Sequence, residues 1–295
     1  MNSESRAPDR LVRTLSRDGG IAVRAIVGTR LVSEAARRHR TSPTATTALG
    51  RTLLGALLLA ADGKGGESVQ IQFRGDGPLR GVVALADDAG HARGYVVRPR
   101  AHPPRVDGEL DVHNAVGPGV LTVVRQRPGQ QPYTGVVQIV SGTIAQDLTH
   151  YLAESEQSRT AVALGVQEGS GAGVAAAAGF LVHALPGASA EETRRAEQNV
   201  RATSLPSELV AGGCDASGLV ERLLDGLGAR ELTESDVDFH CGCDAERVAA
   251  AVRLLGAEEI ARSARAGEAL EVRCQFCAEA YTLGPDALRA LCRDS

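Results

Sequence analysis

Four of the six cysteines in this 295-residue chain form two tight pairs near the C-terminus. Cys241 and Cys243 form a C-x-C pair, and after thirty further residues Cys274 and Cys277 form a C-x-x-C pair. Zinc prefers four sulfur or nitrogen ligands in a tetrahedron, and two short turns can each supply two thiolates. The spacing therefore predicts a four-cysteine site for one Zn²⁺ per chain.

A redox C-x-x-C motif is the main alternative interpretation of the second pair. A thioredoxin-like motif follows an early strand and opens a helix inside an α/β unit. Residues 270–273 are strand-like, but the pair lies at the tail of the chain without such a unit around it. A thiol oxidoreductase is therefore disfavoured. Cys214 and Cys292 stand alone and are interpreted as incidental.

The two cysteine pairs are also compatible with a switch that responds to oxidation. Structural zinc supplies an apparent ~10–16 kcal/mol of folding free energy to a small domain. If an oxidant converted each pair to a disulfide, each bond would close a loop of three or four residues and add only about 1.5–2 kcal/mol. Oxidation would then unfold the C-terminus and remove whatever the preceding helices pack against. The same cysteines also fit a permanent structural zinc site, and their spacing does not discriminate between a switch and a structural site.

Composition and charge exclude several classes of function. The net charge is −4 with a pI near 6.0, and no basic cluster is present, which argues against general nucleic-acid binding. The start is polar, and the longest apolar runs, 53–61 and 171–182, fall short of the ~20 residues that span a bilayer. We expect a cytoplasmic protein without a signal peptide. The seven histidines show no metal or triad spacing, so no enzyme is predicted.

The sequence pattern of residues 1–185 predicts a strand-rich antiparallel α+β domain. Asp9 is expected to cap a short helix that runs to Arg17. Alternating apolar residues and turn signals predict the rest. The expected strands are 21–27, 69–73, 79–86, 91–98, 120–127, 133–140, 160–167 and 175–185, and the expected helices are 29–40, 43–61 and 143–158. The glycine-rich loop 169–173 lacks a phosphate-binding pattern and is interpreted as a hairpin connection.

Residues 186–238, the linker segment, differ from the preceding residues in charge and in predicted secondary structure. Residues 186–240 hold eleven acidic residues and five arginines, a net charge of −6. Three short amphipathic helices are predicted at 190–203, 207–212 and 217–227, and such helices are marginally stable alone. The last has one apolar face, formed by Leu219, Val220, Leu223, Leu224 and Leu227. An ordinary helical linker and a conditionally folded segment both remain open.

Residues 239–295 form the predicted zinc domain. Asp244 is expected to cap a helix that runs to Leu255. Three aromatic residues, Phe239, Phe276 and Tyr281, are expected to pack around the metal. The domain carries seven arginines and nine acidic residues, so it offers no basic face for nucleic acid.

Several motifs together resemble the heat shock protein 33 family, the bacterial redox-regulated chaperones of 33 kDa. The resemblance covers nearly the whole chain and is specific because the motifs occur in order with the C-x-C pair. The motifs are GDGPLR at 75–80, GVV at 135–137, YLAESEQSRT at 151–160, GFLV at 179–182, HCGCDAE at 240–246, LLGAEEI at 254–260 and VRCQFCAE at 272–279.

This resemblance implies a holdase chaperone that uses no nucleotide. It implies that Cys241, Cys243, Cys274 and Cys277 bind zinc in the reduced, inactive form. Oxidants such as hypochlorite, or peroxide with heat, would form disulfides Cys241–Cys243 and Cys274–Cys277, release zinc, unfold the linker segment and cause dimerisation. Residues 1–185 would bind substrate and dimerise.

The preferred hypothesis is thus a redox-gated protein that binds unfolded clients, with the apolar face around 219–227 as the tentative client site. The alternative is a constitutive zinc-ribbon module that binds a partner or nucleic acid. Zinc release coupled to a gain of client binding would discriminate the two.

Overall fold

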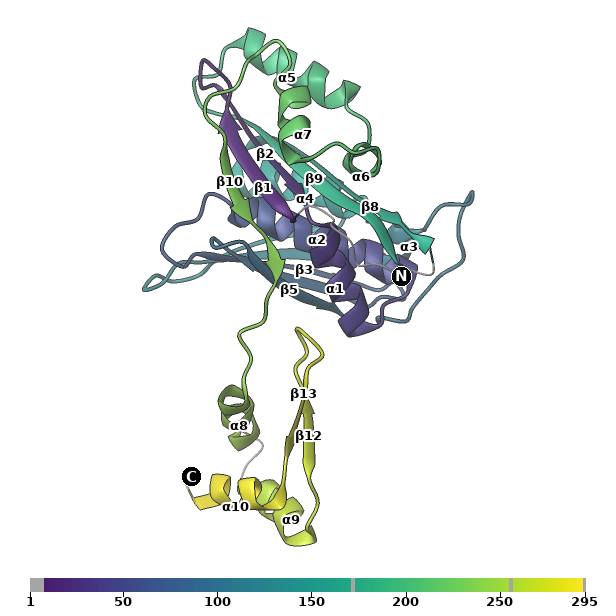
Figure 1. The fold of residues 1–295 in the computed structure, drawn as a ribbon, viewed down its shortest axis with the longest axis vertical. Helices are drawn as coiled ribbons and strands as arrows, with labels where there is room; N and C mark the ends of the chain where they lie inside the picture. Colours follow the sequence, from purple (N-terminus) through teal and green to yellow (C-terminus); the bar gives the residue numbers. More distant parts are fainter. Residues whose placement is uncertain (1–7, 171–172, 255–256, 294–295) are drawn as a thin grey trace. The chain divides into compact units, whose positions relative to one another are not determined.

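The structure is a computed structural model that describes residues 8–170, 173–254 and 257–293 (Figure 1). The chain divides into two compact units, one ending at His240 and the other starting at Cys241. The first unit combines two sheets with helices, and the second combines three helices with a small hairpin. The predicted α+β class is confirmed.

The first sheet has five antiparallel strands in the order β10-β1-β2-β9-β8. Its strands are β1 (Arg10–Leu15), β2 (Ile21–Val27), β8 (Arg159–Glu168), β9 (Val174–Ala184) and β10 (Thr233–Asp236). The predicted hairpin of β8 and β9 is confirmed. The edge strand β10 comes from the linker segment, more than 200 residues after β1, so short-range patterns could not reveal it.

The second sheet has six strands in the order β11-β5-β4-β3-β6-β7. Its strands are β3 (Ser68–Gly75), β4 (Val82–Asp87), β5 (His91–Val96), β6 (Gly119–Gln126), β7 (Tyr133–Gln138) and β11 (Asp238–Phe239). All pairings are antiparallel except that of β11 with β5, which is parallel. The predicted meander is confirmed, and the linker segment again supplies one edge.

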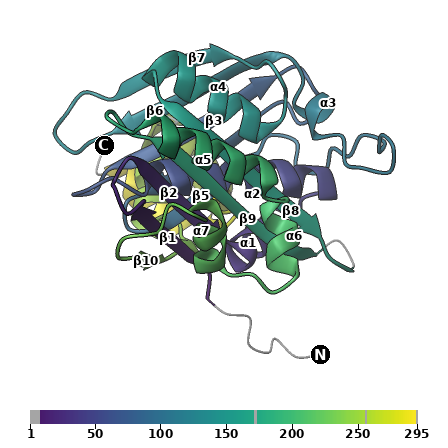
Figure 2. The same cartoon turned by 90° about the horizontal axis from the view of Figure 1, so that it is seen from above.

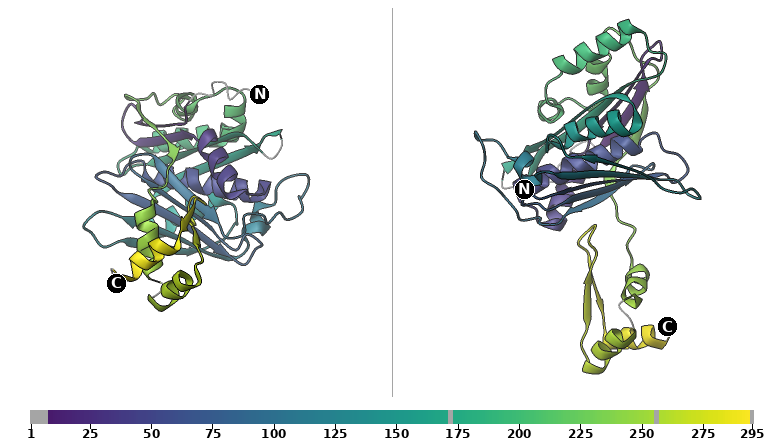
Figure 3. Two further views of the ribbon diagram at one scale, coloured as in Figure 1. Left: turned by 60° about the horizontal axis from the view of Figure 1, so that its bottom comes forward. Right: turned by 180° about the vertical axis from the view of Figure 1, so that it is seen from behind.

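A buried helix, α2 (Pro43–Ala60), packs against strands of both sheets (Figures 1 and 3). Ser42 caps it by accepting a hydrogen bond from the Ala45 N–H, and Pro43 occupies its first turn. Close packing demands Gly50, because a Cβ there would lie 2.6 Å from a Val32 methyl. The remaining helices of this layer are α1 (Thr29–His39), α3 (Val112–Val116) and α4 (Ile144–Glu156).

The helix predicted after Asp9 is wrong, because residues 10–15 form β1. This stretch pairs with β2 on one side and β10 on the other, and tertiary pairing overrides local helix signals. Asp9 caps a different helix. Its carboxylate accepts the N–H groups of Arg30 and Leu31, at 3.1 and 2.7 Å, at the start of α1.

Three helices of the linker segment lie on one face of the first sheet, as Figure 2 shows. They are α5 (Ala190–Ala202), α6 (Pro206–Ala211) and α7 (Ala216–Leu223). The first two lie close to the predicted bounds, whereas α7 ends four residues before the predicted end, so Leu224 and Leu227 follow the helix. The apolar face of α7 joins Val12, Val23 and Phe180 of the sheet in a second hydrophobic core. The linker helices thus find their packing partner within the first unit.

The second unit is small. Its elements are α8 (Ala245–Arg253), α9 (Ala257–Ala266), β12 (Leu270–Arg273), β13 (Ala280–Leu283) and α10 (Pro285–Arg293). Its core contains Val252, Ile260, Ala264, Leu288 and Leu291. Across the described part of the chain, no helix combines the length and the hydrophobicity that a membrane span requires.

Candidate metal centre

The four cysteines of the two predicted pairs lie together in the second unit. Their sulfur atoms all lie within 4.8 Å of one another. The Sγ atoms of Cys241 and Cys274 are 3.9 Å apart, and those of Cys243 and Cys277 are 3.3 Å apart. The fold therefore brings together the four side chains that the spacing singled out.

This donor set fits one metal ion. Zinc–thiolate bonds of about 2.3 Å place the four sulfurs of a tetrahedron about 3.8 Å apart. The observed separations, from 3.3 Å up to 4.8 Å, bracket that value. Cys277 is buried and the other three are half-buried, so the cluster is partly shielded from solvent. Its all-sulfur chemistry suits zinc.

The hairpin of β12 and β13 positions the C-x-x-C pair. The Cys274 N–H donates to the Glu279 carbonyl, and the Ala278 N–H donates to the Cys274 carbonyl, both at 2.8 Å. Ala278 adopts a φ of 59°, in the left-handed region that residues with a Cβ rarely enter. This tight turn directs both sulfurs of the pair toward one point.

The start of α8 positions the C-x-C pair. Asp244 caps the helix by accepting the Arg247 N–H at 2.7 Å, which confirms the predicted cap. The Arg247 guanidinium reaches back and donates to the Gly242 carbonyl between the two cysteines. The helix terminus therefore fixes the backbone that carries Cys241 and Cys243.

The predicted trio of aromatic residues around the cluster is partly wrong. The Tyr281 hydroxyl lies 3.1 Å from the Cys243 Sγ and 3.2 Å from the Cys243 carbonyl oxygen. Phe276 is half-buried in the turn between the second pair. Phe239 belongs to the first unit instead, because β11 pairs with β5 and the Arg38 guanidinium lies 5.5 Å from the centre of its ring.

The pKa values of the cluster thiols are shifted in different directions by their surroundings. Burial raises the pKa of Cys241 and of Cys277. Burial also acts to raise the pKa of Cys243, but hydrogen bonds from the Tyr281 hydroxyl and the neighbouring thiols outweigh it, and the pKa is lowered. Among these three thiols, Cys243 therefore ionises most readily, and Tyr281 is the group that stabilises its thiolate.

The predicted client-site residues lie in the first unit and are covered there. Leu219, Val220 and Leu223 have no exposed surface and Leu224 is 3% exposed, while Leu227 is partly buried against the same core. Cys214 packs beside this core, and Cys292 packs against the core of the second unit. None of these seven residues was expected at the metal, and the structure places none of them in the cluster.

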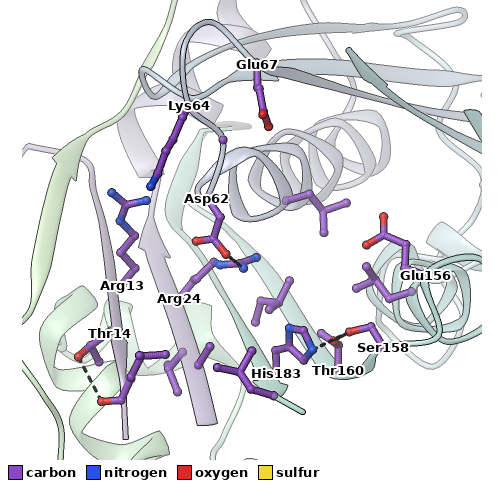
Figure 4. Close-up of a pocket in the computed structure, with 18 of the residues that line it drawn as sticks. Arg13, Thr14, Arg24, Asp62, Lys64, Glu67, Glu156, Ser158, Thr160 and His183 are labelled. Atoms are coloured by element: carbon purple, nitrogen blue, oxygen red, sulfur yellow. Dashed lines mark hydrogen bonds and ion pairs between the residues drawn. The ribbon is translucent and has the colours of Figure 1, made fainter. Parts of the chain in front are cut away.

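A polar cleft of about 1130 Å³ in the first unit contains a pair that spacing did not suggest (Figure 4). The Ser158 hydroxyl lies 3.1 Å from His183 Nε2, because β8 and β9 bring the two residues together. Burial and the nearby Arg24 charge lower the pKa of His183. Three carboxylates of this cleft bind arginines in the ion pairs Asp62–Arg24, Glu67–Arg127 and Glu156–Arg125.

Three arginines of this cleft have a structural role at the end of α2. Arg13, Arg24 and Arg125 donate to the carbonyls of Ala61, Leu58 and Leu59, respectively. The last carbonyls of a helix have no partner within it and carry the negative end of its dipole. Because α2 has no basic residue in its own last turn, arginines from β1, β2 and β6 supply the hydrogen bonds.

Comparisons with known proteins agree with this fold and cluster. A family model described as "Hsp33 protein" matches residues 9–284. The chain is 41% identical to the 33 kDa chaperonin of Symbiobacterium thermophilum over 280 residues, which cover 94% of this chain and 95% of that protein. It is 39% identical to the 33 kDa chaperonin of Geobacter sulfurreducens over 295 residues, which cover 100% and 98%.

A solved structure of the same family also matches this chain. The crystal structure of the 33 kDa chaperonin of Thermotoga maritima, a heat shock protein 33 homolog, matches with a TM-score of 0.91 and 30% identity, covering 98% of this chain and 99% of that one. Agreement of this extent in both sequence and structure confirms the resemblance, and the chain belongs to the heat shock protein 33 family of chaperones.

Proposed function

We propose that this chaperone is a redox-gated holdase, which binds unfolded proteins and prevents their aggregation when oxidants reach its cysteines. The observation that carries the proposal is the convergence of four sulfur atoms within 4.8 Å of one another in a unit with a very small core. Such a unit depends on its metal for folding. No nucleotide and no catalytic step on the client are needed.

In the reduced form, Cys241, Cys243, Cys274 and Cys277 would hold one Zn²⁺. Zinc supplies the long-range crosslink of the second unit when it is bound. During activation, each thiolate pair gives two electrons to an oxidant such as hypochlorite, which takes up two protons from solvent and leaves as chloride and water, and each pair becomes one disulfide. The proposed bonds are Cys241–Cys243 and Cys274–Cys277, and peptide mapping of the oxidised chain would identify them.

Clients would then bind to apolar surface that the linker segment covers. Release of α7 and the residues that follow it would expose the apolar side chains of Leu219, Val220, Leu223, Leu224 and Leu227, together with the sheet residues on which they pack. We assign residues 1–185 to substrate binding and dimerisation, 186–238 to the metastable linker and 239–295 to the redox switch. The active form would be a homodimer in the cytoplasm, without nucleic-acid or membrane partners.

The decisive experiment couples two readouts. Aggregation of a chemically unfolded client is followed with the reduced, zinc-loaded protein and then with the oxidised protein, while released zinc is measured in the same samples. We expect about one zinc per chain to leave as suppression of aggregation appears. Zinc that stays bound, or leaves without any gain in suppression even when mild urea or a modest rise in temperature weakens the linker packing, would instead favour a constitutive interaction module. Cys214→Ser and Cys292→Ser variants serve as matched controls and should activate normally.

A further inference from the structure

Residues 233–240, the bridging segment, cover the edges of both sheets just before the first metal-site cysteine. β10 pairs antiparallel with β1, with Arg10 opposite Asp236 and Arg13 opposite Thr233. β11 then pairs parallel with β5 (Figure 1). A strand at the edge of a sheet presents unpaired backbone groups that can accept another strand. One segment thus closes two such edges.

The backbone hydrogen bonds show which groups face the bridging segment. The Arg230 N–H donates to the Leu15 carbonyl at 2.9 Å, and the Val237 N–H donates to the Asp9 carbonyl at 3.3 Å. Backbone groups alternate between the two sides of a strand. Leu11 and Arg13 therefore face Ser235 and Thr233 of β10, whereas Val12 and Thr14 of β1 face β2.

The next residues of the bridging segment bind the second sheet through the opposite side of the backbone. The Asp238 N–H donates to the Gly90 carbonyl at 3.1 Å, and the His240 N–H donates to the Ala92 carbonyl at 2.9 Å. Val237 and the β10 residues before it thus hold the first sheet, and Asp238 and His240 hold the second. Release of the segment would free both edges together.

Main-chain hydrogen bonds hold β10 with little help from side chains. All four of its residues, Thr233 to Asp236, are exposed. The ion pair of Arg10 with Asp236, at 3.2 Å, joins side chains that are 41% and 77% exposed, and an exposed pair of this kind contributes little stability. The edge of β1 therefore accepts a strand largely without regard to its sequence.

On β1 itself, neighbouring side chains are buried on opposite faces of the first sheet, next to the exposed position that β10 occupies. Leu11 is buried in the core that contains α2, and Val12 is buried in the core that contains α7. An extended chain on this edge would satisfy its backbone along β1, and every second side chain would lie on the face that α7 covers. Strand addition combines backbone affinity with pockets for alternate side chains. That combination suits an unfolded polypeptide of arbitrary sequence.

We propose that β10 is a resident strand on a β-augmentation site, and that release of the bridging segment opens the β1 edge to an extended segment of an unfolded client. This proposal rests on the proposed holdase function and names where a client is held. β10 itself argues for the occupant, because an extended peptide already lies there in register. The site is closed while the bridging segment is held and opens with it.

Amide hydrogen exchange of the full chain tests the assignment. The client probe is reduced, carboxymethylated lactalbumin, which cannot refold. In the reduced, zinc-bound protein the amides of Leu11 and Arg13 should exchange slowly. Oxidation should accelerate both, and the client should slow them again by about tenfold or more. The amides of Val12 and Thr14, which face β2, serve as the internal control and should stay protected throughout.

Two results would overturn the proposal while the holdase function stands. In one, the oxidised protein holds the client but Leu11 and Arg13 keep exchanging fast. In the other, both amides of the oxidised protein are protected even without client, and the protection increases with protein concentration. That result would mean that a second copy of the chain occupies the β1 edge. If the oxidised protein holds no client at all, the proposed function itself fails and this proposal fails with it.

A pair of proline variants gives an independent check. Ser235→Pro removes an N–H that faces β1, whereas Glu234→Pro removes one that faces away, where an edge strand tolerates proline. With zinc bound and no oxidant, we expect Ser235→Pro to hold a measurable fraction of the client and Glu234→Pro to hold none. Equal behaviour of the two variants would contradict the role of the β10 backbone as the cover of this site.

Discussion

At the scale of single residues, the metal cluster has a polar neighbour, Tyr281, which the sequence predicted only as an aromatic residue packed around the metal. The Tyr281 hydroxyl is within hydrogen-bonding distance of both the sulfur and the carbonyl oxygen of Cys243. Groups around a metal that hydrogen-bond its ligands tune affinity and reactivity. A hydrogen bond to a thiolate withdraws charge from the sulfur and slows its attack on an oxidant.

Tyr281→Phe should therefore sensitise the switch. We expect zinc to remain bound under reducing conditions, with an affinity about tenfold lower, and hypochlorite to release it several-fold faster than from the unmodified protein. A chromogenic chelator in a stopped-flow experiment measures both. Tyr133→Phe is the matched control, because the Tyr133 hydroxyl donates to the Ser155 carbonyl in the first unit. Identical release rates for the two variants would argue against a role for Tyr281.

Glu192 joins the linker segment to the first sheet. Its carboxylate accepts the Ser16 hydroxyl at 2.9 Å and completes a capping box with Ser189 at the start of α5. The hydrogen bond from Ser16, helped by the Ser189 backbone N–H, lowers the pKa of Glu192 below its ordinary 4.5. A carboxyl whose pKa is lower in the folded state stabilises that state above the unfolded pKa, and the effect is lost as pH falls through the folded pKa.

Acid should therefore loosen α5 at pH values below about 4.5. Glu192→Gln should open α5 several-fold more often at neutral pH, and the acid-dependent step should disappear. Hydrogen exchange of residues 190–202 as a function of pH measures both effects. Glu191→Gln is the control, since Glu191 pairs with Arg194 on the exposed side of the same helix. Unchanged pH dependence in Glu192→Gln would place the acid sensitivity elsewhere.

Some residue roles were predictable from the sequence and others were not. The C-x-C and C-x-x-C pairs fixed the cluster because each pair is local and a metal needs four donors. Asp9 was assigned to the wrong helix, since its N–H partners, Arg30 and Leu31, lie some twenty residues away. The contact of Ser158 with His183 likewise exists only once β8 and β9 have paired. Contacts that depend on tertiary pairing leave no local signal.

At the scale of elements, periodicity predicted most helices and strands of the first unit, although it missed the short helix α3. It failed where strands pair across long distances. Residues 10–15 were expected to be helical, although β1 is held between β2 and the distant β10. The strands β10 and β11 were not predicted, because short, polar, acidic segments carry no alternating apolar pattern. Their backbone, rather than their side chains, defines them.

The apolar face of α7 is the element on which the linker segment depends. Leu223 has no exposed surface and packs in the second core. Leu223→Ala should cost about 2–5 kcal/mol of local stability, as cavity-forming substitutions in cores do. We therefore expect the reduced, zinc-bound variant to bind a hydrophobic dye and to suppress client aggregation in part.

Leu205→Ala provides the comparison for this variant. Leu205 precedes α6 in the same linker segment but is 54% exposed, so its truncation leaves no cavity. Both variants are assayed for dye binding, aggregation of the unfolded client and zinc content before any oxidant is added. A Leu223→Ala protein that stays as inactive as Leu205→Ala would show that packing of α7 does not hold the chaperone closed.

At the scale of the whole molecule, the sequence identified the four cysteines of the metal cluster but misplaced the support of the linker segment. The linker helices were expected to lose their packing partner when the zinc unit unfolds. The structure places that partner on the first sheet, and the core beneath α5 to α7 contains no residue of 241–295. The bridging segment, which ends directly before Cys241, is the covalent route by which the second unit can act on the first.

This arrangement predicts that loss of zinc and release of the linker segment are separable steps. A strong chelator added to the reduced protein should unfold the second unit, since its small core cannot replace the ~10–16 kcal/mol that zinc supplies. The peptides covering 257–292 should then lose protection from hydrogen exchange, while those covering 190–223 keep it. Mild urea or a modest rise in temperature should release the linker helices in a second step.

Activation would then require two inputs, thiol oxidation and a condition that weakens the packing of α7 on the sheet. Suppression of client aggregation should follow the second step, so chelated protein at low temperature should hold little client. The Leu223→Ala variant should merge the two steps, because its linker packing is already weakened, whereas Leu205→Ala should keep them apart. Simultaneous loss of protection in both groups of peptides on chelation alone would contradict this order and would mean that the bridging segment transmits unfolding directly.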